Sequence, residues 1–160
     1  MSHDILVSME FFTAIDKVVL IRLLIALALG AVIGLERFYA KKPANMRTYA
    51  LVSVASAMFV IVGELVLVRY QNVPGISLNP MMIASAIVTG IGFLGAGLII
   101  FKQSHLQNLT TAAGLWAASA IGVAEGFGLP HLAIMGTILT LIILFVLGHV
   151  EHRMKEKLHE

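Results

Sequence analysis

Charged residues divide the chain into five long uncharged stretches. The gaps are 13 residues between Arg22 and Glu36, 16 between Arg47 and Glu64, 32 between Arg69 and Lys102, 22 between Lys102 and Glu125, and 25 between Glu125 and Glu151. A helix needs about 20 mostly apolar residues to cross the hydrocarbon core of a bilayer. The pattern therefore predicts five membrane-spanning helices, at residues 18–35, 48–68, 81–101, 109–124 and 129–150.

The two ends of the chain depart from this apolar pattern. Ile5, Met9, Phe12 and Ile15 recur near helical spacing, which predicts either a short helix at the membrane interface or an extension of the first span. Charge is concentrated again after the fifth span. We expect one domain, with an N-terminal interfacial segment at 1–17, a transmembrane domain at 18–150 and a charged cytoplasmic tail at 151–160.

Composition supports an all-α integral membrane protein, a compact bundle of five transmembrane helices whose solvent is the lipid bilayer. Hydrophobic residues make up 59% of the chain, charged residues 12%, and the mean hydropathy is +0.93. A soluble domain has about 25% charged residues. The sequence pI of about 9.1 reflects a net charge of only +2, and the basic residues flank apolar runs, so no nucleic-acid partner is expected. Acidic residues precede the first Lys, which is atypical of a cleaved signal peptide.

The basic residues also predict the orientation in the membrane, because short cytoplasmic loops carry an excess of Lys and Arg. With the N-terminus outside, eight Lys and Arg lie on the cytoplasmic side and two on the exterior. The cytoplasmic set is Arg37, Lys41, Lys42, Arg47, Lys102, Arg153, Lys155 and Lys157, and the exterior set is Lys17 and Arg69. We expect the N-terminus outside and the C-terminus in the cytoplasm.

Small residues form a stripe on each of the third and fourth spans. The third contains Gly90, Gly92, Gly95 and Gly97, with Ser85, Thr89, Gly92 and Ala96 on one helix face, and the fourth contains Thr110, Ala113, Ala117, Ala120 and Ala124. Such stripes allow close helix packing in lipid, so we expect the two spans to face each other in a tight hairpin. The alternative is a broken third helix whose carbonyls face an ion.

Ionisable side chains within or beside the spans are candidates for function. Arg22 and Glu64 are each four residues from the predicted outer end of a span, so they either form an ion pair or reach the interface separately. Asn79 and Glu125 are further candidates on the outer side.

A second polar group is predicted on the cytoplasmic side. It comprises Glu36 and Arg37, Arg47 and Thr48, and Thr110 and Thr111. We expect Glu36, Arg37, Arg47 and Thr111 to meet in one cluster, with the threonine hydroxyls also capping free amides of the fourth helix. His149, His152 and His159 are interleaved with basic residues and indicate a solvated helix end, so neither a metal site nor a cofactor is expected.

Four segments together resemble the MgtC/SapB family of bacterial inner-membrane proteins. They are LIALALGAVIGLER from residue 24, MRTYALVS from 46, GIGFLGAG from 90, and LTTAAGLW from 109 followed by AIG from 120. The resemblance implies five spans with the N-terminus outside, and a role in magnesium homeostasis or in growth under low-magnesium or acid stress. It also implies that Glu36, Arg37, Arg47, Thr48, Thr110 and Thr111 are site residues.

The chain departs from the family pattern in its polar positions. Asn79, Met82 and Ala86 stand where the family usually has Asp, Arg and Gln, and Gln107 and Asn108 replace an Arg-Gly pair. We also expect the soluble C-terminal domain of longer members to be absent.

Two functions remain compatible with the sequence after these departures from the family pattern. One is a regulatory or scaffolding membrane protein that forms a homodimer or joins a larger membrane complex; the other is a channel or transporter for Mg²⁺ or protons. No intramembrane Ser/His pair, paired Asp or metal-ligand set favours an enzyme.

Overall fold

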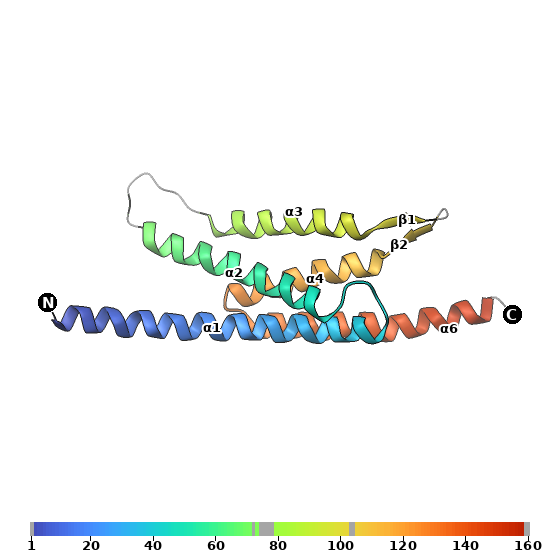
Figure 1. Cartoon of the computed structure of the whole chain (residues 1–160), viewed down its shortest axis with the longest axis horizontal. Coiled ribbons are helices and arrows are strands. Elements are labelled where there is room, and N and C mark those ends of the chain that lie inside the picture. The colour runs from blue at the N-terminus through green and yellow to red at the C-terminus, as the bar shows by residue number, and fades with distance from the viewer. Residues whose placement is uncertain (1, 72, 74–78, 103–104, 159–160) are drawn as a thin grey trace.

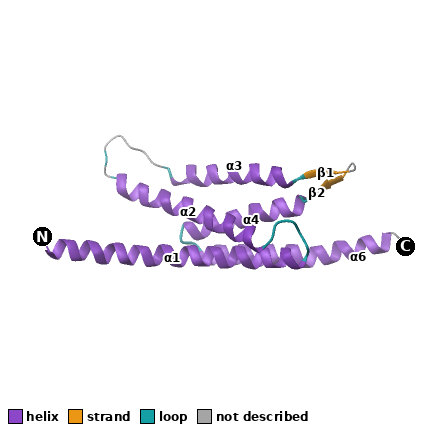
Figure 2. Cartoon of the chain, in the orientation of Figure 1, coloured by secondary structure: helices purple, strands orange, loops and turns teal. Residues whose placement is uncertain are grey.

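The computed structural model describes residues 2–71, 73, 79–102 and 105–158, and within them the chain is a helical bundle (Figures 1 and 2). The helices are α1 (Ser2–Tyr39), α2 (Met46–Tyr70), α3 (Pro80–Leu98), α4 (Leu109–Gly126), α5 (Pro130–Ile142), a π-helical turn η1 (Ile143–Leu147) and α6 (Gly148–Leu158). Two short antiparallel strands, β1 (Ile100–Lys102) and β2 (His105–Gln107), join α3 to α4. Because α5, η1 and α6 continue one another, the described chain forms five helical rods, and the predicted fold class is confirmed.

Within the described part of the chain, four segments are long and apolar enough to cross a membrane. They are Asp16–Tyr39, Met46–Tyr70, Pro80–Leu98 and Pro130–Glu151. The fifth rod, α4, is built largely from Ala, Gly, Ser and Thr and packs against α1, α2, α3 and α5. A helix enclosed by other helices does not need a strongly apolar surface, which explains why α4 is the least apolar predicted span.

The two chain ends lie at opposite ends of the bundle (Figure 1). The connection between α1 and α2, the β1–β2 hairpin and α6 lie together at one end, here called the basic end. The start of α1, the end of α2 and the start of α3 lie at the other, here called the N-terminal end. This alternation matches five crossings. Which end faces the cytoplasm remains a prediction from the charge count.

The helix boundaries follow local signals. At the start of α3, the Asn79 Oδ1 accepts a hydrogen bond from the Met81 amide at 2.9 Å, and Pro80 occupies the first turn. Pro130 begins α5 in the same way, as predicted. Gly128, with φ of +69°, ends the turn after α4, a left-handed conformation that glycine adopts without strain.

One expected boundary differs from the structure, and both chain ends continue the neighbouring helices. The third span was expected to reach residue 101, but α3 ends at Leu98 and β1 follows. Helix α1 runs unbroken from Ser2, so no break separates residues 2–17 from the first span. The side chains of Ile5, Met9, Phe12 and Ile15 lie outside the described part, and their place at the interface stays a prediction. The predicted tail continues the last rod as α6.

The helices approach most closely at glycines that the predicted stripes did not include. A Cβ added to Gly30 would lie 2.7 Å from the Tyr49 carbonyl oxygen, and one added to Gly34 would lie 2.5 Å from the Met46 Cα, so α1 and α2 touch through their backbones. On α4, Gly122 packs against the Ser53 backbone. The spacing of Gly30 and Gly34, and of Gly122 and Gly126, is the GxxxG signature that could have identified these contacts.

The predicted packing of the two small-residue stripes against each other is wrong within one chain. A Cβ added to Gly90, Gly92 or Gly97 would meet nothing within 4 Å. Only Gly95 follows the prediction, since its Cβ would lie 3.7 Å from the Ala112 Cβ. On α4 the predicted stripe is mostly turned outward; Thr110, Ala113 and Ala120 are exposed, Ala117 is half-buried and Ala124 is buried. Helix α2 packs against the other face of α4. The alternative of a broken α3 is also wrong, because the helix is continuous through all four glycines.

Candidate functional site

Arg22 joins three helices at the N-terminal end of the bundle. Its Nη1 lies 2.9 Å from the Glu64 Oε2 on α2 and donates to the Gly126 carbonyl oxygen on α4 at 3.1 Å. Of the two alternatives for Arg22 and Glu64, the ion pair is therefore the one present. The turn at Gly128 adds to this geometry, since a Cβ there would lie 2.7 Å from the Arg22 Nη2.

Glu125 belongs to the same region. Glu125 is 1% exposed, and Arg22 is the charged side chain that interacts with it electrostatically. Arg22, Glu64 and Glu125 are called the Arg22 cluster below. The structure thus brings together three of the four outer candidates. Asn79 does not join them, because its side chain caps α3.

Glu36 and Arg37 form a pair at the basic end. The Arg37 Nη2 donates to the Glu36 Oε1 at 2.6 Å, and the Arg37 Nε donates to the Glu36 Oε2. Arg37 is only 3% exposed, so Glu36 supplies the counter-charge that a buried guanidinium requires. Arg47 was expected in this cluster, but its side chain is exposed and it forms no ion pair among the described residues. That expectation is wrong because Arg37 turns inward and takes the carboxylate.

Tyr49 occupies the place expected for Arg47. It is fully buried, its hydroxyl donates to the Thr111 carbonyl oxygen at 3.2 Å, and its ring packs against Gly114. Arg37 and Glu36 are close enough to interact electrostatically with the phenol. Glu36, Arg37, Tyr49 and Thr111 are called the Arg37 cluster below. Tyr49 was missed although it lies within MRTYALVS; an aromatic hydroxyl four residues from Ser53 on one helix face was the available signal.

The remaining predicted residues of this end have separate roles. Thr110 is exposed and lines a cavity of about 540 Å³ together with Glu36, Arg37, Lys42 and His149. Thr48 is half-buried. Capping by Thr110 and Thr111 is not the arrangement found, because α4 begins at Leu109 and both threonines lie inside the first turn. Asn108 occupies the N-cap position, and its side chain donates to the Leu98 carbonyl oxygen at 3.1 Å instead.

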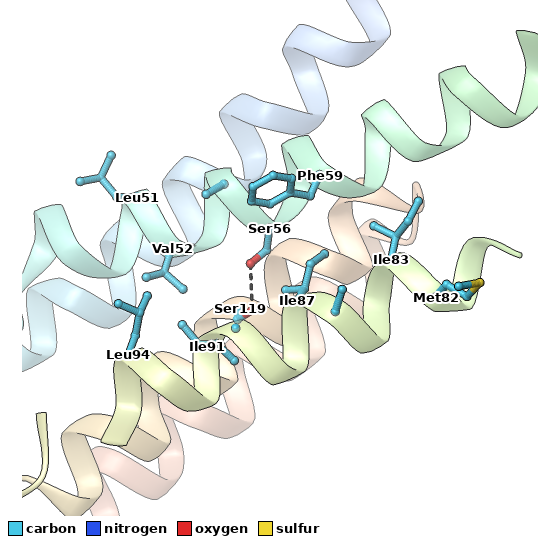
Figure 3. A pocket seen from close by; sticks show the side chains of 13 residues that line it. Leu51, Val52, Ser56, Phe59, Met82, Ile83, Ile87, Ile91, Leu94 and Ser119 are labelled. Carbon is cyan, nitrogen blue, oxygen red and sulfur yellow. Dashed lines mark hydrogen bonds between the residues drawn. The ribbon is translucent and has the colours of Figure 1, made fainter. Parts of the chain in front are cut away.

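An apolar groove of about 750 Å³ separates α2, α3 and α4 over part of their length (Figure 3). Leu51 and Phe59 line it from α2, and Ile87 and Leu94 from α3. At its base the Ser56 and Ser119 hydroxyls are hydrogen-bonded at 2.8 Å, as the dashed line in Figure 3 shows. Helix α3 contacts its neighbours through Ile83, which covers Gly63, and through Gly95, which meets Ala112.

Apolar residues separate the two polar clusters. Ala57, Val60 and Ile61 of α2 are buried between Ser56 and Glu64, and Gly126 packs against Ala57 and Val60. Towards the basic end, Gly122 packs on Ser53, whose hydroxyl is buried without a hydrogen-bond partner among the described residues. The buried hydroxyls of α2 and α4 thus stop short of the Arg22 cluster.

Metal ligation has little support in the described part of the chain, where no group of three or more His, Cys, Asp or Glu side chains converges. The His149 Nδ1 donates a hydrogen bond to the Phe145 carbonyl oxygen at 2.9 Å. His159 and the side chain of His152 lie outside the described part.

Comparison with known proteins gives a consistent family. The MgtC family matches residues 23–153. The chain is 37% identical over 138 residues to YhiD of Escherichia coli strain K12, which is named as a candidate magnesium transporter; the match covers 86% of this chain and 64% of YhiD. It is 36% identical over 137 residues to protein MgtC of Salmonella typhimurium strain LT2, covering 86% and 55% of the two chains.

A third relative extends the comparison. Protein SapB of Bacillus subtilis is 36% identical over 115 residues, covering 71% of this chain and 50% of SapB. The chain therefore spans about half to two thirds of the length of these relatives. No solved structure matches it. The family model matches most of the chain, and its helices are apolar enough to cross a membrane. This chain therefore belongs to the MgtC family and is a multi-pass bacterial membrane protein.

Proposed function

We propose that this protein is a regulatory or scaffolding membrane protein linked to magnesium homeostasis and to growth under low-magnesium or acid stress, and that it is not an enzyme. It acts by binding a transmembrane helix of another membrane protein. The magnesium link rests on the family and on the names of the relatives, which point to a magnesium-related membrane function.

The observation that carries this proposal is the outward-facing small-residue surface of α3. Ser85, Thr89, Gly92 and Ala96 are all exposed, and a Cβ at Gly92 would meet nothing within 4 Å. Small residues on a lipid-facing helix let a second helix approach until the backbones touch, and van der Waals contact then stabilises the pair. A residue set of this kind has no packing role inside the chain itself.

Helix α4 offers a second indication. Trp116 is 52% exposed on a helix that is otherwise the most enclosed, and exposed Ala113 and Ala120 lie on the same face one turn away on either side. Aromatic side chains are enriched at protein contact surfaces, and small residues let membrane helices approach closely. The bundle is thus open on a side where a partner helix can pack.

The second candidate is transport of Mg²⁺ or protons by the chain itself. Polar clusters at both ends and the hydroxyls of Ser53, Ser56 and Ser119 between them favour it. It would require α2 and α4 to separate where Gly122 and Gly126 now bring their backbones together. That closed contact favours regulation over transport.

Growth in low magnesium tests the proposed surface. The variant Gly92→Leu fills the small-residue face without touching the fold, and Ala28→Leu is a matched control at an exposed position of α1, whose main neighbours are α2, α4 and α5. In a strain that lacks its own family member, we expect Ala28→Leu to restore growth and Gly92→Leu to fail at equal membrane abundance. Equal rescue by both variants would contradict a binding role for this face.

A further inference from the structure

Glu125 places a carboxyl group inside the bundle at its N-terminal end. The residue is 1% exposed, and its Oε2 has no hydrogen-bond partner among the described residues. Burying an ionised carboxylate without a hydrogen bond is strongly unfavourable, whereas the neutral acid carries no charge to desolvate. The surroundings of Glu125 therefore decide which form it holds.

One cation faces two carboxyl groups here. Arg22 already donates to the Glu64 Oε2 at 2.9 Å and to the Gly126 carbonyl oxygen at 3.1 Å. Helices α1, α2, α3 and α5 pack against α4. No residue of Pro80–Leu98 in α3 is titratable. The other titratable side chains that the structure describes near this end, all exposed, are Asp16 and Lys17 on α1, Arg69 and Tyr70 on α2 and His131 on α5. Glu125 thus has no second buried cation among the described residues.

We propose that Glu125 is a proton-binding site. It carries a proton while Arg22 holds Glu64, and when that proton leaves to water, the carboxylate formed competes with Glu64 and the Gly126 carbonyl for the Arg22 guanidinium. The ligand is a proton rather than a metal ion, because no group of three or more His, Cys, Asp or Glu side chains that could hold a metal converges among the described residues. This inference is independent of the proposed function.

The proton then controls how firmly three helices are joined. Arg22 is on α1, Glu64 on α2, and Gly126 at the end of α4, so their hydrogen bonds connect the three helices. Transfer of Arg22 to Glu125 keeps the link between α1 and α4 and releases the link to α2. Protonation of one buried carboxyl is in this way coupled to the position of α2.

Infrared difference spectroscopy of the full chain in liposomes tests the site. We expect a protonated-carboxyl band at neutral pH that shifts in D₂O, disappears at alkaline pH and is absent from Glu125→Gln. Asp16→Asn is the matched control, an exposed carboxyl of α1, and should keep the band. In Glu64→Gln, Arg22 is released to Glu125, so the band should disappear at lower pH than in the unmodified protein.

Three results would overturn the proposal. They are a wild-type protein without the band at neutral pH, a band that persists in Glu125→Gln, and a band that added Mg²⁺ removes at constant pH, which would identify a metal-ion site. The Glu64→Gln comparison keeps the test decisive if Glu125→Gln does not fold, because an unchanged pH dependence there would also contradict the shared guanidinium.

Discussion

At the residue scale, Arg37 makes the basic end of the bundle sensitive to single substitutions. Its guanidinium is buried and depends on Glu36, whereas Arg47, only one loop away, is exposed. Arg37 and Arg47 carry the same charge and are close in the sequence, but they therefore contribute differently to the free energy of unfolding. Removing the partner of a buried charge is costly because the charge that remains is neither solvated nor paired.

The variants Glu36→Gln and Arg47→Gln measure this difference. We expect Glu36→Gln to reduce the free energy of unfolding by about 3 kcal/mol, the cost of leaving a buried charge without its partner. Arg47→Gln should change it by less than about 0.5 kcal/mol, as is usual for an exposed position. Thermal and denaturant unfolding in detergent micelles measures both, and equal effects, or a strong coupling between the two in the double variant, would restore the pairing of Glu36 with Arg47.

At the scale of elements, glycine position determines which helices touch. Gly34 and Gly122 each bring a helix against the α2 backbone, while Gly92 faces open space. A leucine at either of the first two positions would push two backbones apart. A leucine at Gly92 would extend into the surroundings of the bundle.

We therefore expect Gly34→Leu and Gly122→Leu to cost about 3 kcal/mol or more, or to prevent folding, because overpacking against backbone cannot be relieved by a side-chain shift. Gly92→Leu should leave the thermal midpoint of the purified single chain close to that of the unmodified protein. Size-exclusion chromatography and thermal unfolding in detergent are the measurements. Loss of the fold in Gly92→Leu would show that the face is part of the intramolecular core after all.

The number, order and approximate limits of the helices could be predicted from the sequence, because uncharged length and flanking charge suffice to locate spans in lipid. The partners of each face could not. Small residues are equally compatible with a neighbour inside the chain and with one outside it, so the stripe at Gly90, Gly92 and Gly97 was assigned to the wrong neighbour. In the same way charge alone favoured Arg47 over Tyr49, since the inward turn of Arg37 is a property of the packed helices.

At the scale of the whole molecule, successive helices run in alternating directions between the two ends of the bundle (Figure 1). Eight of the eleven Lys and Arg belong to the segments that lie at the basic end. The chain contains no cysteine, so single cysteines can be introduced as probes without background. We expect a cysteine at Ser2 to react with a membrane-impermeant reagent in intact cells and one at Lys157 to be protected. The reverse labelling pattern would overturn the orientation with the N-terminus outside.

The central claim is that the chain acts through contacts with another membrane protein and does not itself move ions. Between the Arg22 and Arg37 clusters, the interior of the chain is filled by Ala57, Val60 and Gly122. Flux of Mg²⁺ and of protons into liposomes that contain only this protein, read with fluorescent indicators inside the vesicles, tests this most directly. We expect flux no greater than in protein-free liposomes at either neutral or acidic pH. Flux that depends on the protein and is abolished by Glu64→Gln or Glu36→Gln would contradict it and establish the chain as a transporter.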